Sequence, residues 1–502
     1  MSKGKVFLVG AGPGDPKLIT VRGMETIKLA DCIVYDRLAS PRLLAHAKPD
    51  VELIYCGKLP DRHTLTQEEI NQVLVDKAME GKVVTRLKGG DPSIFGRVGE
   101  EAEELVKHGI PFELVPGITS GIAAPAYAGI PVTHRDFNSS LAIVTGHERP
   151  EKTESSINWE KLATAVETII FYMGVGNLPF IREQLIKYGR SPQTPVALIR
   201  WGTTVDQETL VGTLEDIVEK REAVGLTNPA IIIVGEVVAL REKLQWFENK
   251  PFFGKRILVT RARSQASELS EQISELGGEP FEFPLVKMVP PSDSKPLDDA
   301  LQNLSSFDWV MFTSPNGVAF FFKRLRELGV DIRSLRGKIA AVGPKTAEAL
   351  QEKGLTVDVL PGEFRNEGLL DSLKGELKPG ERVLLPRADI AREILPKTLR
   401  ELGLDVTEAD TYDTLIDAEN IAETLSLLEE KAIHIITFTS SSTVKNFVQA
   451  MQGHDLSQLL EGVKIACIGP ITANTARELG LTVDWVASDY TIQGLLDVIK
   501  QG

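Results

Sequence analysis

ILVTRA at residues 257–262 is followed 126 residues later by VLLPRA at 383–388. The same offset relates three further pairs of segments: FTS at 312–314 and 438–440, GP at 343–344 and 469–470, and GLTVD at 354–358 and 480–484. A repeat of this length far exceeds the units of solenoids and propellers, so each copy predicts a small domain with its own core. The first half of the chain takes no part in the repeat, which predicts two unrelated proteins joined in one chain.

Length and composition are those of an ordinary soluble protein. The chain has 502 residues, which predicts three or four domains, with 42% hydrophobic and 25% charged residues. No apolar run approaches the roughly 20 residues of a membrane span, and the N-terminus does not resemble a signal peptide. The three cysteines are far apart and form no CxxC pair, so we expect no metal cluster or disulfide framework, and a cytoplasmic location. The net charge of −14 argues against nucleic acid as a partner.

The boundary between the halves lies near residue 250, where the charged stretch 241–254 carries Pro251 and Gly254. Strands that alternate with amphipathic helices on both sides of this boundary predict α/β layers with mainly parallel sheets. We expect lobes of about 1–135 and 136–245, a linker at 246–253, and a second half at 254–502.

A glycine-rich turn, GAGPGDP at 10–16, follows the strand expected at 5–9 and precedes a helical stretch near 18–30. It could bind a dinucleotide, with Asp36 as the acidic residue after the next strand. However, Pro13 and Pro16 stand where that fingerprint requires a glycine in the first helical turn. A tight turn with only a backbone role is a further alternative.

Two more glycine turns favour a ligand site built from bare backbone. RLKGGDPSIFGR at 86–97 repeats the Gly-Asp-Pro element after the strand expected at 83–87, and VPGITS at 115–120 ends another short apolar strand. Glycine lets a ligand touch the main chain, whose amides and carbonyls then contact its polar groups.

These turns, with VYDRL at 34–38, YCGK at 55–58, PVTHRD at 131–136 and FYMG at 171–174, resemble the tetrapyrrole methylases, specifically uroporphyrinogen-III C-methyltransferases. The resemblance covers about residues 3–245. It implies two α/β lobes with S-adenosylmethionine between them, and a homodimer. Carried over by motif, the cofactor contacts are Pro13, Gly89, Gly90, Asp91, Ile94, Thr119, Ser120, Met173 and Gly202.

The resemblance also implies the chemistry of this half. Methyl transfer to a pyrrole carbon depends on positioning, and the macrocycle must lose a proton to a base as the carbon is alkylated. The family's base matches Asp36, and its proton donor or anchor matches Lys58. Arg97, His134 and Arg135 are candidates for binding substrate carboxylates. Each of these residues could instead be a surface charge or a structural ion pair.

The second half shows no nucleophile elbow, metal spacing or paired carboxylates. It has two matched rows of small polar residues, TSPNG at 313–317 and TSSST at 439–443, each expected at a strand end before a helix whose amides favour anions. GPKT at 343–346 and GPIT at 469–472 have the same placement. Ordinary helix caps would explain many of these residues equally well.

Residues 254–502 resemble uroporphyrinogen-III synthases through ILVTRA, FTSPNGV at 312–318, AVGP at 341–344, TYDT at 411–414, TFTSS at 437–441 and CIGPITA at 467–473. The resemblance implies a cofactor-free lyase with two duplicated lobes that exchange segments, about 254–287 with 415–502, around 288–414. Tyr412 matches the family's cleft tyrosine, although a core aromatic is the alternative. The expected substrate-binding residues are Arg261, Thr313, Ser314, Asn316, Arg387, Thr439, Ser440, Gly469 and Thr472.

The fusion predicts one pathway, because the product of the second half would be the substrate of the first. We expect the chain to close hydroxymethylbilane to uroporphyrinogen III with ring D inversion and loss of water. It would then methylate that product at C2 and C7 to precorrin-2, towards siroheme or cobalamin. The alternatives are a methylase with another acceptor, a nucleotide-dependent oxidoreductase, and a second half that binds tetrapyrroles without converting them.

Overall fold

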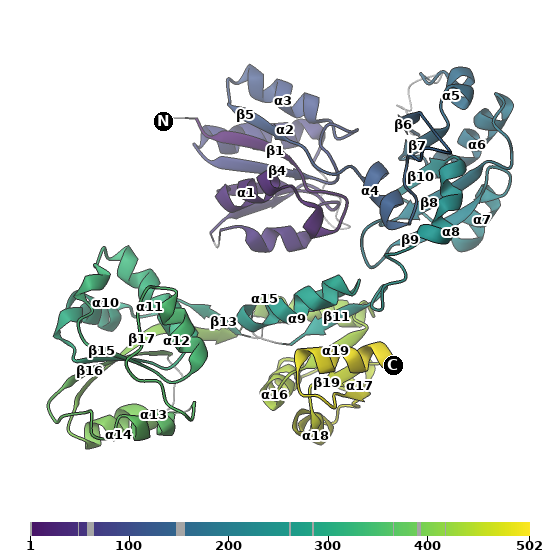
Figure 1. Ribbon diagram of the computed structural model, residues 1–502. Coiled ribbons are helices and arrows are strands. Elements are labelled where there is room, and N and C mark those ends of the chain that lie inside the picture. The colour runs from purple at the N-terminus through teal and green to yellow at the C-terminus, as the bar shows by residue number, and fades with distance from the viewer. Residues whose placement is uncertain are drawn as a thin grey trace.

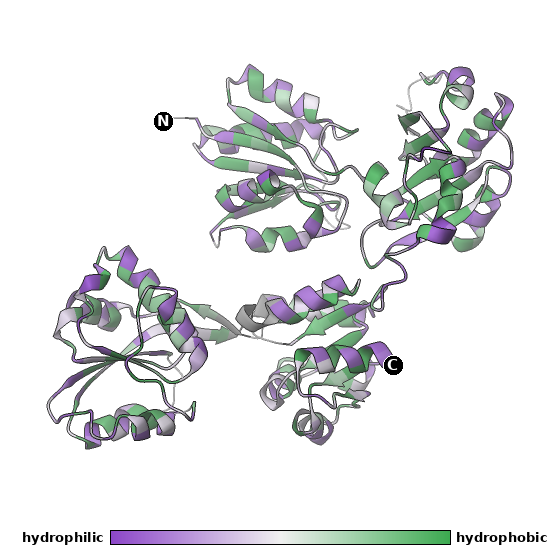
Figure 2. Ribbon diagram, in the orientation of Figure 1, coloured by the Kyte–Doolittle hydropathy of each residue, from purple (hydrophilic) through white to green (hydrophobic). Residues whose placement is uncertain are grey.

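This computed structural model describes residues 3–48, 50–57, 65–146, 156–260, 263–283, 286–364, 366–388, 393–416 and 418–502. Within these residues the strands form four separate five-stranded sheets, two in each half of the chain. Figure 1 shows each sheet flanked by its own helices, and Figure 2 shows the hydrophobic residues gathered on the strands. Lys58 and Arg261 lie outside the described residues, so their predicted roles remain without a structural setting.

The first sheet is entirely parallel and has the order β3-β2-β4-β1-β5. Its strands are β1 (Lys5–Gly10), β2 (Cys32–Tyr35), β3 (Glu52–Tyr55), β4 (Val83–Lys88) and β5 (Phe112–Val115). Its helices are α1 (Val21–Leu29), α2 (Gln67–Met79) and α3 (Val98–Lys107). Alternate residues of β1 pack on opposite faces, Val6 and Leu8 towards α2 and α3, and Phe7 and Val9 towards α1. Both faces are therefore covered, as a parallel sheet requires.

The second sheet differs from the prediction of mainly parallel sheets, which is wrong here. Its order is β6-β7-β10-β8-β9, and only β6 and β7 are parallel. The strands are β6 (Leu141–Thr145), β7 (Thr168–Tyr172), β8 (Pro195–Arg200), β9 (Glu208–Thr213) and β10 (Ala230–Val234). The helices are α4 (Ser120–Tyr127), α5 (Trp159–Ala165), α6 (Leu178–Lys187), α7 (Ile217–Val224) and α8 (Arg241–Leu244). The seven residues between β8 and β9 are too few for a parallel crossover, so the chain returns as a hairpin.

The third and fourth sheets have matching strand orders, β12-β11-β18-β19-β20 and β13-β17-β16-β14-β15. The strands of the third sheet are β11 (Arg256–Val259), β12 (Glu279–Glu282), β18 (Ile435–Phe438), β19 (Lys464–Cys467) and β20 (Trp485–Val486). Its helices are α9 (Arg263–Glu275), α15 (Ala418–Glu429), α16 (Ser441–Ala450), α17 (Leu456–Leu459), α18 (Pro470–Glu478) and α19 (Ile492–Gln501). The strands of the fourth sheet are β13 (Val286–Val289), β14 (Trp309–Phe312), β15 (Lys338–Ala341), β16 (Arg382–Ala388) and β17 (Asp405–Ile416). Its helices are α10 (Lys295–Gln302), α11 (Pro315–Glu327), α12 (Pro344–Gln351), α13 (Asn366–Ser372) and α14 (Ile394–Glu401).

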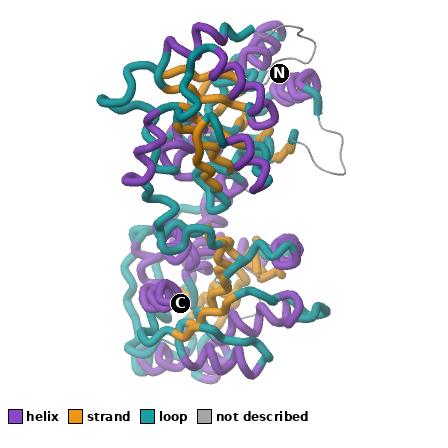
Figure 3. Tube along the Cα trace, turned by 90° about the vertical axis from the view of Figure 1, so that its right-hand side faces the viewer, coloured by secondary structure: helices purple, strands orange, loops and turns teal. Residues whose placement is uncertain are grey.

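The sequence repeat is also a structural repeat, because β14 and β15 begin 126 residues before β18 and β19. The copies exchange segments: β11 of the first copy pairs with β12 on one side and with β18 of the second copy on the other, in one parallel sheet. This confirms the predicted fold class of duplicated, segment-exchanged α/β lobes. In the fourth sheet only the β13–β17 pair is antiparallel. Figure 3 shows strands enclosed by helices in both halves.

The stretch predicted to connect the halves packs against α4. The Trp246 indole donates a hydrogen bond to the Ala126 carbonyl at 2.9 Å, and Arg241 donates to the Ala128 carbonyl at 2.6 Å. Phe247 and Phe252 are buried, with exposed fractions of 7% and 1%. Apolar burial therefore fixes this stretch at both of its ends.

Candidate active sites

Three glycine turns meet at the carboxyl ends of β4, β1 and β5. Gly12 and Gly90 exchange two backbone hydrogen bonds, of 3.2 and 2.7 Å. A Cβ on Gly10 would lie 2.6 Å from the Cα of Gly117, and a Cβ on Gly117 would lie 2.4 Å from the Gly90 carbonyl oxygen. Because no side chain fits there, the three turns form a surface of bare backbone, as the sequence predicts.

Asp91 ties the second turn to the third. Its Oδ2 accepts a hydrogen bond from the Gly117 amide at 2.9 Å, and its Oδ1 accepts one from the Ser93 amide at 2.7 Å. The family resemblance implies a direct cofactor contact for this residue. The geometry shows a carboxylate that holds the turns together, and through them the neighbouring Gly89, Gly90 and Ile94.

The second lobe reaches the same place through Tyr172. Its hydroxyl lies 2.5 Å from Thr119 Oγ1 and accepts a hydrogen bond from the Gly121 amide at 2.5 Å, where Ser120 begins α4. Next to it, Met173 is 48% exposed. A Cβ on Gly202 would lie 2.3 Å from the Ala124 Cβ, so this turn also needs glycine. The structure thus brings the predicted cofactor residues of both lobes to one region.

The first glycine turn also contacts the second lobe directly. The Asp15 amide donates to Thr203 Oγ1 at 3.0 Å, and Asp15 Oδ2 accepts from the Tyr127 hydroxyl at 2.8 Å. A Cβ on Gly14, the residue after the predicted contact Pro13, would lie 2.7 Å from the Thr204 side chain. These contacts set the spacing of the two lobes beside the turns.

Backbone strain gathers around this region. Six non-glycine residues in the described part of the chain have positive φ, and five of them are Phe95, Arg97, Met173, Trp201 and Thr203. Each such residue costs about 1–3 kcal/mol and persists where the surroundings enforce it, most often at functional sites. The clustering supports a ligand site between the lobes.

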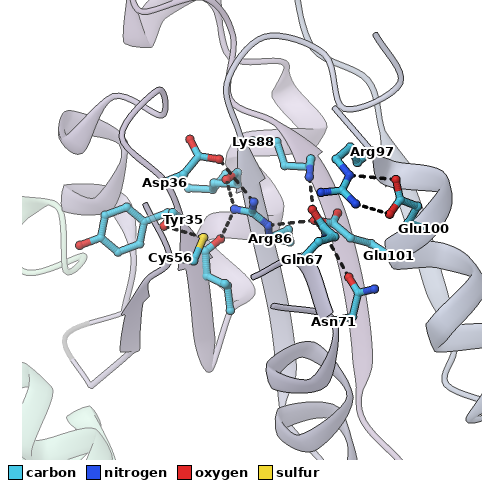
Figure 4. Close-up of polar contacts among 12 residues, drawn as sticks. Tyr35, Asp36, Cys56, Gln67, Asn71, Arg86, Lys88, Arg97, Glu100 and Glu101 are labelled. Atoms are coloured by element: carbon cyan, nitrogen blue, oxygen red, sulfur yellow. Dashed lines mark hydrogen bonds and ion pairs between the residues drawn. The ribbon is translucent and has the colours of Figure 1, made fainter. Parts of the chain in front are cut away.

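A buried charge cluster lies beneath the turns (Figure 4). Arg86 and Lys88 on β4 both point at Glu101 on α3, with Nε–Oε1 and Nζ–Oε1 distances of 3.3 and 2.7 Å. Their exposed fractions are 3%, 6% and 0%. Gln67 donates to the same Glu101 oxygen at 3.3 Å. Among the described residues, Glu101 Oε2 is buried without a hydrogen-bond partner.

Asp36 joins this cluster at its open end. Arg86 Nη2 lies 3.3 Å from Asp36 Oδ2, and the Asp36 side chain is 27% exposed. Asp36 Oδ1 accepts a hydrogen bond from the Leu38 amide at 3.0 Å. Arg86 therefore holds the predicted base while leaving it open to solvent, which a group that receives a proton requires.

The pKa values of the two cations shift in opposite directions, although burial alone would lower both. Burial lowers the pKa of the Lys88 ammonium below its usual value, helped by the nearby Arg86 charge. Burial also works against the Arg86 charge, but the Glu101 carboxylate outweighs it and raises the Arg86 pKa. The cluster thus keeps a firmly charged guanidinium beside Asp36.

Arg97, His134 and Arg135, the predicted substrate-binding residues of this half, are partly or fully exposed. Arg97 forms a two-pronged ion pair with Glu100, at 2.8 and 2.5 Å, and its side chain is 51% exposed. His134 Nδ1 accepts a hydrogen bond from the Asp136 amide at 3.2 Å, and Arg135 is exposed. Arg97 can exchange Glu100 for a substrate carboxylate because both groups are reached by solvent.

In the second half, Tyr412 lies beside the first polar row. Its hydroxyl is 3.4 Å from Ser314 Oγ, its ring lies 5.3 Å from the Phe320 ring, and it is 7% exposed. Ser314 caps α11 by accepting from the Gly317 amide at 3.0 Å, between the half-buried Thr313 and Asn316. The cap alternative is therefore correct for Ser314, whose oxygen also reaches Tyr412.

The other lobe repeats this arrangement. Ser440, next to the half-buried Thr439, caps α16 through the Thr443 amide at 3.3 Å. Gly469 is the cap residue of α18, and Thr472 is buried with an exposed fraction of 5%. Ser440 is thus a helix cap as well, and the Thr472 side chain faces the interior rather than the open end of the sheet.

Arg387 is engaged by the protein itself. It is 7% exposed and forms an ion pair with Glu408, beside a cavity of about 350 Å³ lined also by Asp293, Asp410 and Asp413. Carboxylates of the substrate would be repelled by these acidic side chains. The sequence predicts Arg387 at a strand end but does not indicate that Glu408, on the adjacent strand, is its partner.

Sequence reasoning missed Lys88, Glu101 and Tyr172. Lys88 and Tyr172 stand inside motifs that we used only for their neighbours. Glu101 precedes the buried Leu105 by one helical turn, so its position on the apolar face of α3 was a usable signal. In the described residues no group of acidic, histidine or cysteine side chains is suited to hold a metal, and no helix is long and apolar enough to cross a membrane.

Comparison with known proteins defines the class. The family model of tetrapyrrole (corrin/porphyrin) methylases matches residues 5–218, and that of uroporphyrinogen-III synthase HemD matches 267–497. The porphyrin biosynthesis protein HemD of Ruminiclostridium josui is 41% identical over all of this chain and 98% of its own length. A uroporphyrinogen-III C-methyltransferase of Bacillus subtilis (strain 168) is 47% identical over 72% of this chain and 74% of its own length.

Fold and sites therefore define a two-part enzyme of porphyrin biosynthesis, a methyltransferase followed by a synthase. The chain belongs to the tetrapyrrole methylase family in its first half and to the uroporphyrinogen-III synthase family in its second. Both resemblances drawn from the sequence are confirmed. A solved uroporphyrin-III C-methyltransferase from Thermus thermophilus, complexed with S-adenosylhomocysteine, is 38% identical over 47% of this chain and all of its own, with a TM-score of 0.41.

Proposed function

We propose that the first half binds S-adenosylmethionine between the glycine turns and the Tyr172–Met173 strand end. The observation that carries this is the backbone surface where the turns meet: a Cβ on Gly10 or Gly117 would meet the opposite turn at under 3 Å, and Gly90 has a positive φ. Such a surface fits an extended polar cofactor, whose groups are contacted by amides and carbonyls. The proposed contacts are Pro13, Gly89, Gly90, Asp91, Ile94, Thr119, Ser120, Met173 and Gly202.

Bound S-adenosylmethionine supplies an electrophilic methyl group on its sulfonium. The two lobes hold the acceptor carbon in line with that methyl group, and positioning supplies much of the rate. Asp36 then receives the proton that the macrocycle loses from another position once the pyrrole carbon is methylated, while Arg86 fixes the orientation of Asp36. Arg97, His134 and Arg135 bind acetate and propionate groups, and Lys58 serves as donor or anchor.

We propose uroporphyrinogen III as the acceptor, methylated at C2 and C7 to precorrin-2 with two molecules of S-adenosylhomocysteine released. The fusion supports this substrate, because a synthase half in the same chain would supply it. The family match favours a tetrapyrrole over another acceptor or a nicotinamide nucleotide. The product would enter siroheme or cobalamin synthesis.

In the second half we propose closure of hydroxymethylbilane with inversion of ring D and without a cofactor. The Tyr412 hydroxyl donates a hydrogen bond to the departing hydroxyl group. That group takes up a proton and leaves as water, and the closure of the ring releases a proton in turn. Thr313, Ser314, Asn316, Thr439, Ser440 and Gly469 bind carboxylates through hydroxyls and amides, with Arg261 as a further charge partner. Thr472 is buried and Arg387 is paired with Glu408, so neither belongs to the proposed set.

We further propose the domain limits 1–245 and 254–502, a homodimer through the methyltransferase half, and a cytoplasmic location. Two α/β lobes in each half, each with its own core, support these limits. Sedimentation of the full chain tests the dimer, because a monomeric mass would contradict it.

Asp91→Ala is expected to weaken S-adenosylmethionine binding about tenfold. The change removes the acceptor of two backbone amides, so the second and third turns lose their tie. Calorimetric titration of the cofactor measures this, with synthase activity as the control for folding. Equal affinity in the variant and the parent would show that Asp91 does not order the site.

Tyr412→Phe is expected to slow ring closure about a hundredfold, since it removes one donor from the leaving group. The ring and its contact with Phe320 are retained, so packing should survive. The measurement is the initial rate of uroporphyrinogen III formation from hydroxymethylbilane. A rate within threefold of the parent would return Tyr412 to a purely structural role.

A further inference from the structure

Two large aromatic side chains stand exposed at equivalent places in the repeat. Phe364 is 61% exposed and Tyr490 is 64% exposed, and the two residues are 126 positions apart. They belong to a matched pair of segments, GEFRNEGLL at 362–370 and SDYTIQGLL at 488–496. The duplication has therefore kept an exposed aromatic ring in both lobes, at a position where the core does not need one.

Both rings lie at the carboxyl edge of their sheets. Tyr490 follows β20, which pairs in parallel with β19, and Phe364 follows Val359, which bridges in parallel to Ala340 on β15. Because all these strands are parallel, their carboxyl ends share an edge with the polar rows that follow β14 and β18. Phe364 therefore lies on the same edge as Thr313, and Tyr490 on the same edge as Thr439.

Each aromatic residue lies beside a glycine turn. A Cβ on Gly469 would lie 3.1 Å from the Tyr490 ring, and a Cβ on Gly343 would lie 3.7 Å from the Phe364 Cβ. Both glycines are the cap residues of the helices that follow, α18 and α12. In each lobe the order along the edge is thus a hydroxyl-bearing turn, a glycine turn and an exposed ring.

The segments that carry the rings are held close to the next helix. A Cβ on Gly368 would lie 2.2 Å from the Glu363 carbonyl oxygen, and a Cβ on Gly494 would lie 2.1 Å from the Asp489 carbonyl oxygen. In both lobes the residue before the aromatic one thus packs against the helix that follows. The two rings are therefore presented from fixed positions and are not parts of long loops.

We propose that Phe364 and Tyr490 are two stacking platforms, one on each lobe, for pyrrole rings of the linear tetrapyrrole. The inference rests on the proposed synthase function. It adds a means of binding the pyrrole rings themselves, which the hydroxyl rows lack. Hydroxyls and amides bind carboxylates, whereas a flat pyrrole ring is recognised by its face. Two platforms on separate lobes fix two rings of a flexible chain, and so bring its ends into the geometry that closes with ring D inverted.

Phe364→Leu and Tyr490→Leu test this on the full-length protein. Each change is expected to raise the KM for hydroxymethylbilane about 3- to 10-fold, as an aromatic contact is lost. The double variant should show the product of the two effects, about 10- to 100-fold, because the residues lie on different lobes. The share of the type I isomer should rise as well, since loosely held substrate closes without inversion.

Ring-retaining variants separate stacking from a general role of the segments. Phe364→Tyr and Tyr490→Phe keep a flat ring and should keep the KM of the parent. Leu402→Ala is the matched control, because Leu402 is 51% exposed in the same half but ends α14, before β17, at the opposite edge of the sheet. It should leave the KM unchanged.

The outcomes distinguish the inference from the function on which it rests. If the parent protein forms no uroporphyrinogen III, the proposed synthase activity fails. If the parent is active and the double leucine variant keeps its KM and isomer ratio, the stacking platforms are refuted. A raised KM in the ring-retaining variants would also refute them, because the ring would then not be the feature that matters.

Discussion

Asp36→Asn is expected to lower the rate of uroporphyrinogen III methylation by about 10²- to 10⁴-fold, the usual contribution of a general base. Asparagine has nearly the same shape, and its side-chain oxygen can still accept the hydrogen bond from the Leu38 amide. Arg86 keeps its ion pair with Glu101, so no buried charge is abandoned. The loss should therefore come from the missing base and not from a disturbed fold.

Single-turnover methylation measures this effect with saturating S-adenosylmethionine and anaerobic uroporphyrinogen III. Asp50→Asn is the matched control, because Asp50 is an exposed aspartate of the same lobe. The cofactor affinity and the rate of ring closure by the second half should remain those of the parent. A methylation rate within a factor of three would assign the base to another residue.

Glu101→Ala has the largest expected effect on stability. Glu101 is fully buried and faces both Arg86 and Lys88. Its removal leaves two buried cations with only the partly exposed Asp36 carboxylate nearby, beside Arg86. Removing one partner from a buried ion pair costs about 3–5 kcal/mol. We expect the first lobe to lose that much of its free energy of unfolding.

Hydrogen exchange in increasing urea measures this loss on peptides from β4 and α3, apart from the other lobes. Glu100→Ala is the control: its ion pair with Arg97 is exposed, so it should cost at most about 1 kcal/mol. Adding Lys88→Met to Glu101→Ala removes one of the stranded cations and should restore part of the stability. Equal stability of Glu101→Ala and the parent would show that the cluster does not hold the lobe together.

The buried strands were the most predictable part of the fold. The strands expected at 5–9 and 83–87 form as β1 and β4, each one residue longer than predicted. Short apolar runs that end at glycine or small polar residues mark such strands directly. Strand direction was less predictable, because hydrophobic pattern does not distinguish parallel from antiparallel neighbours in a fully covered sheet. The second sheet is mostly antiparallel and contains the β8–β9 hairpin, which the hydrophobic pattern did not indicate.

The candidate sites were predictable where chemistry depends on backbone. The glycine turns around Gly10, Gly90 and Gly117 follow from sequence because only glycine permits so close an approach. Side-chain partnerships were not predictable in the same way. Arg387 pairs with Glu408 across two strands, and Asp91 turns its carboxylate to backbone amides. Such contacts depend on register and on tertiary packing, which one sequence does not display.

The most direct test of the central claim is the conversion of hydroxymethylbilane by the full-length protein, with and without S-adenosylmethionine, under anaerobic conditions. Products are separated by isomer-resolving chromatography and weighed by mass spectrometry. The account predicts uroporphyrinogen III without the cofactor and a dimethylated product, precorrin-2, with it. Formation of only the type I isomer would contradict the synthase half, and accumulation of unmethylated type III in the presence of the cofactor would contradict the methyltransferase half.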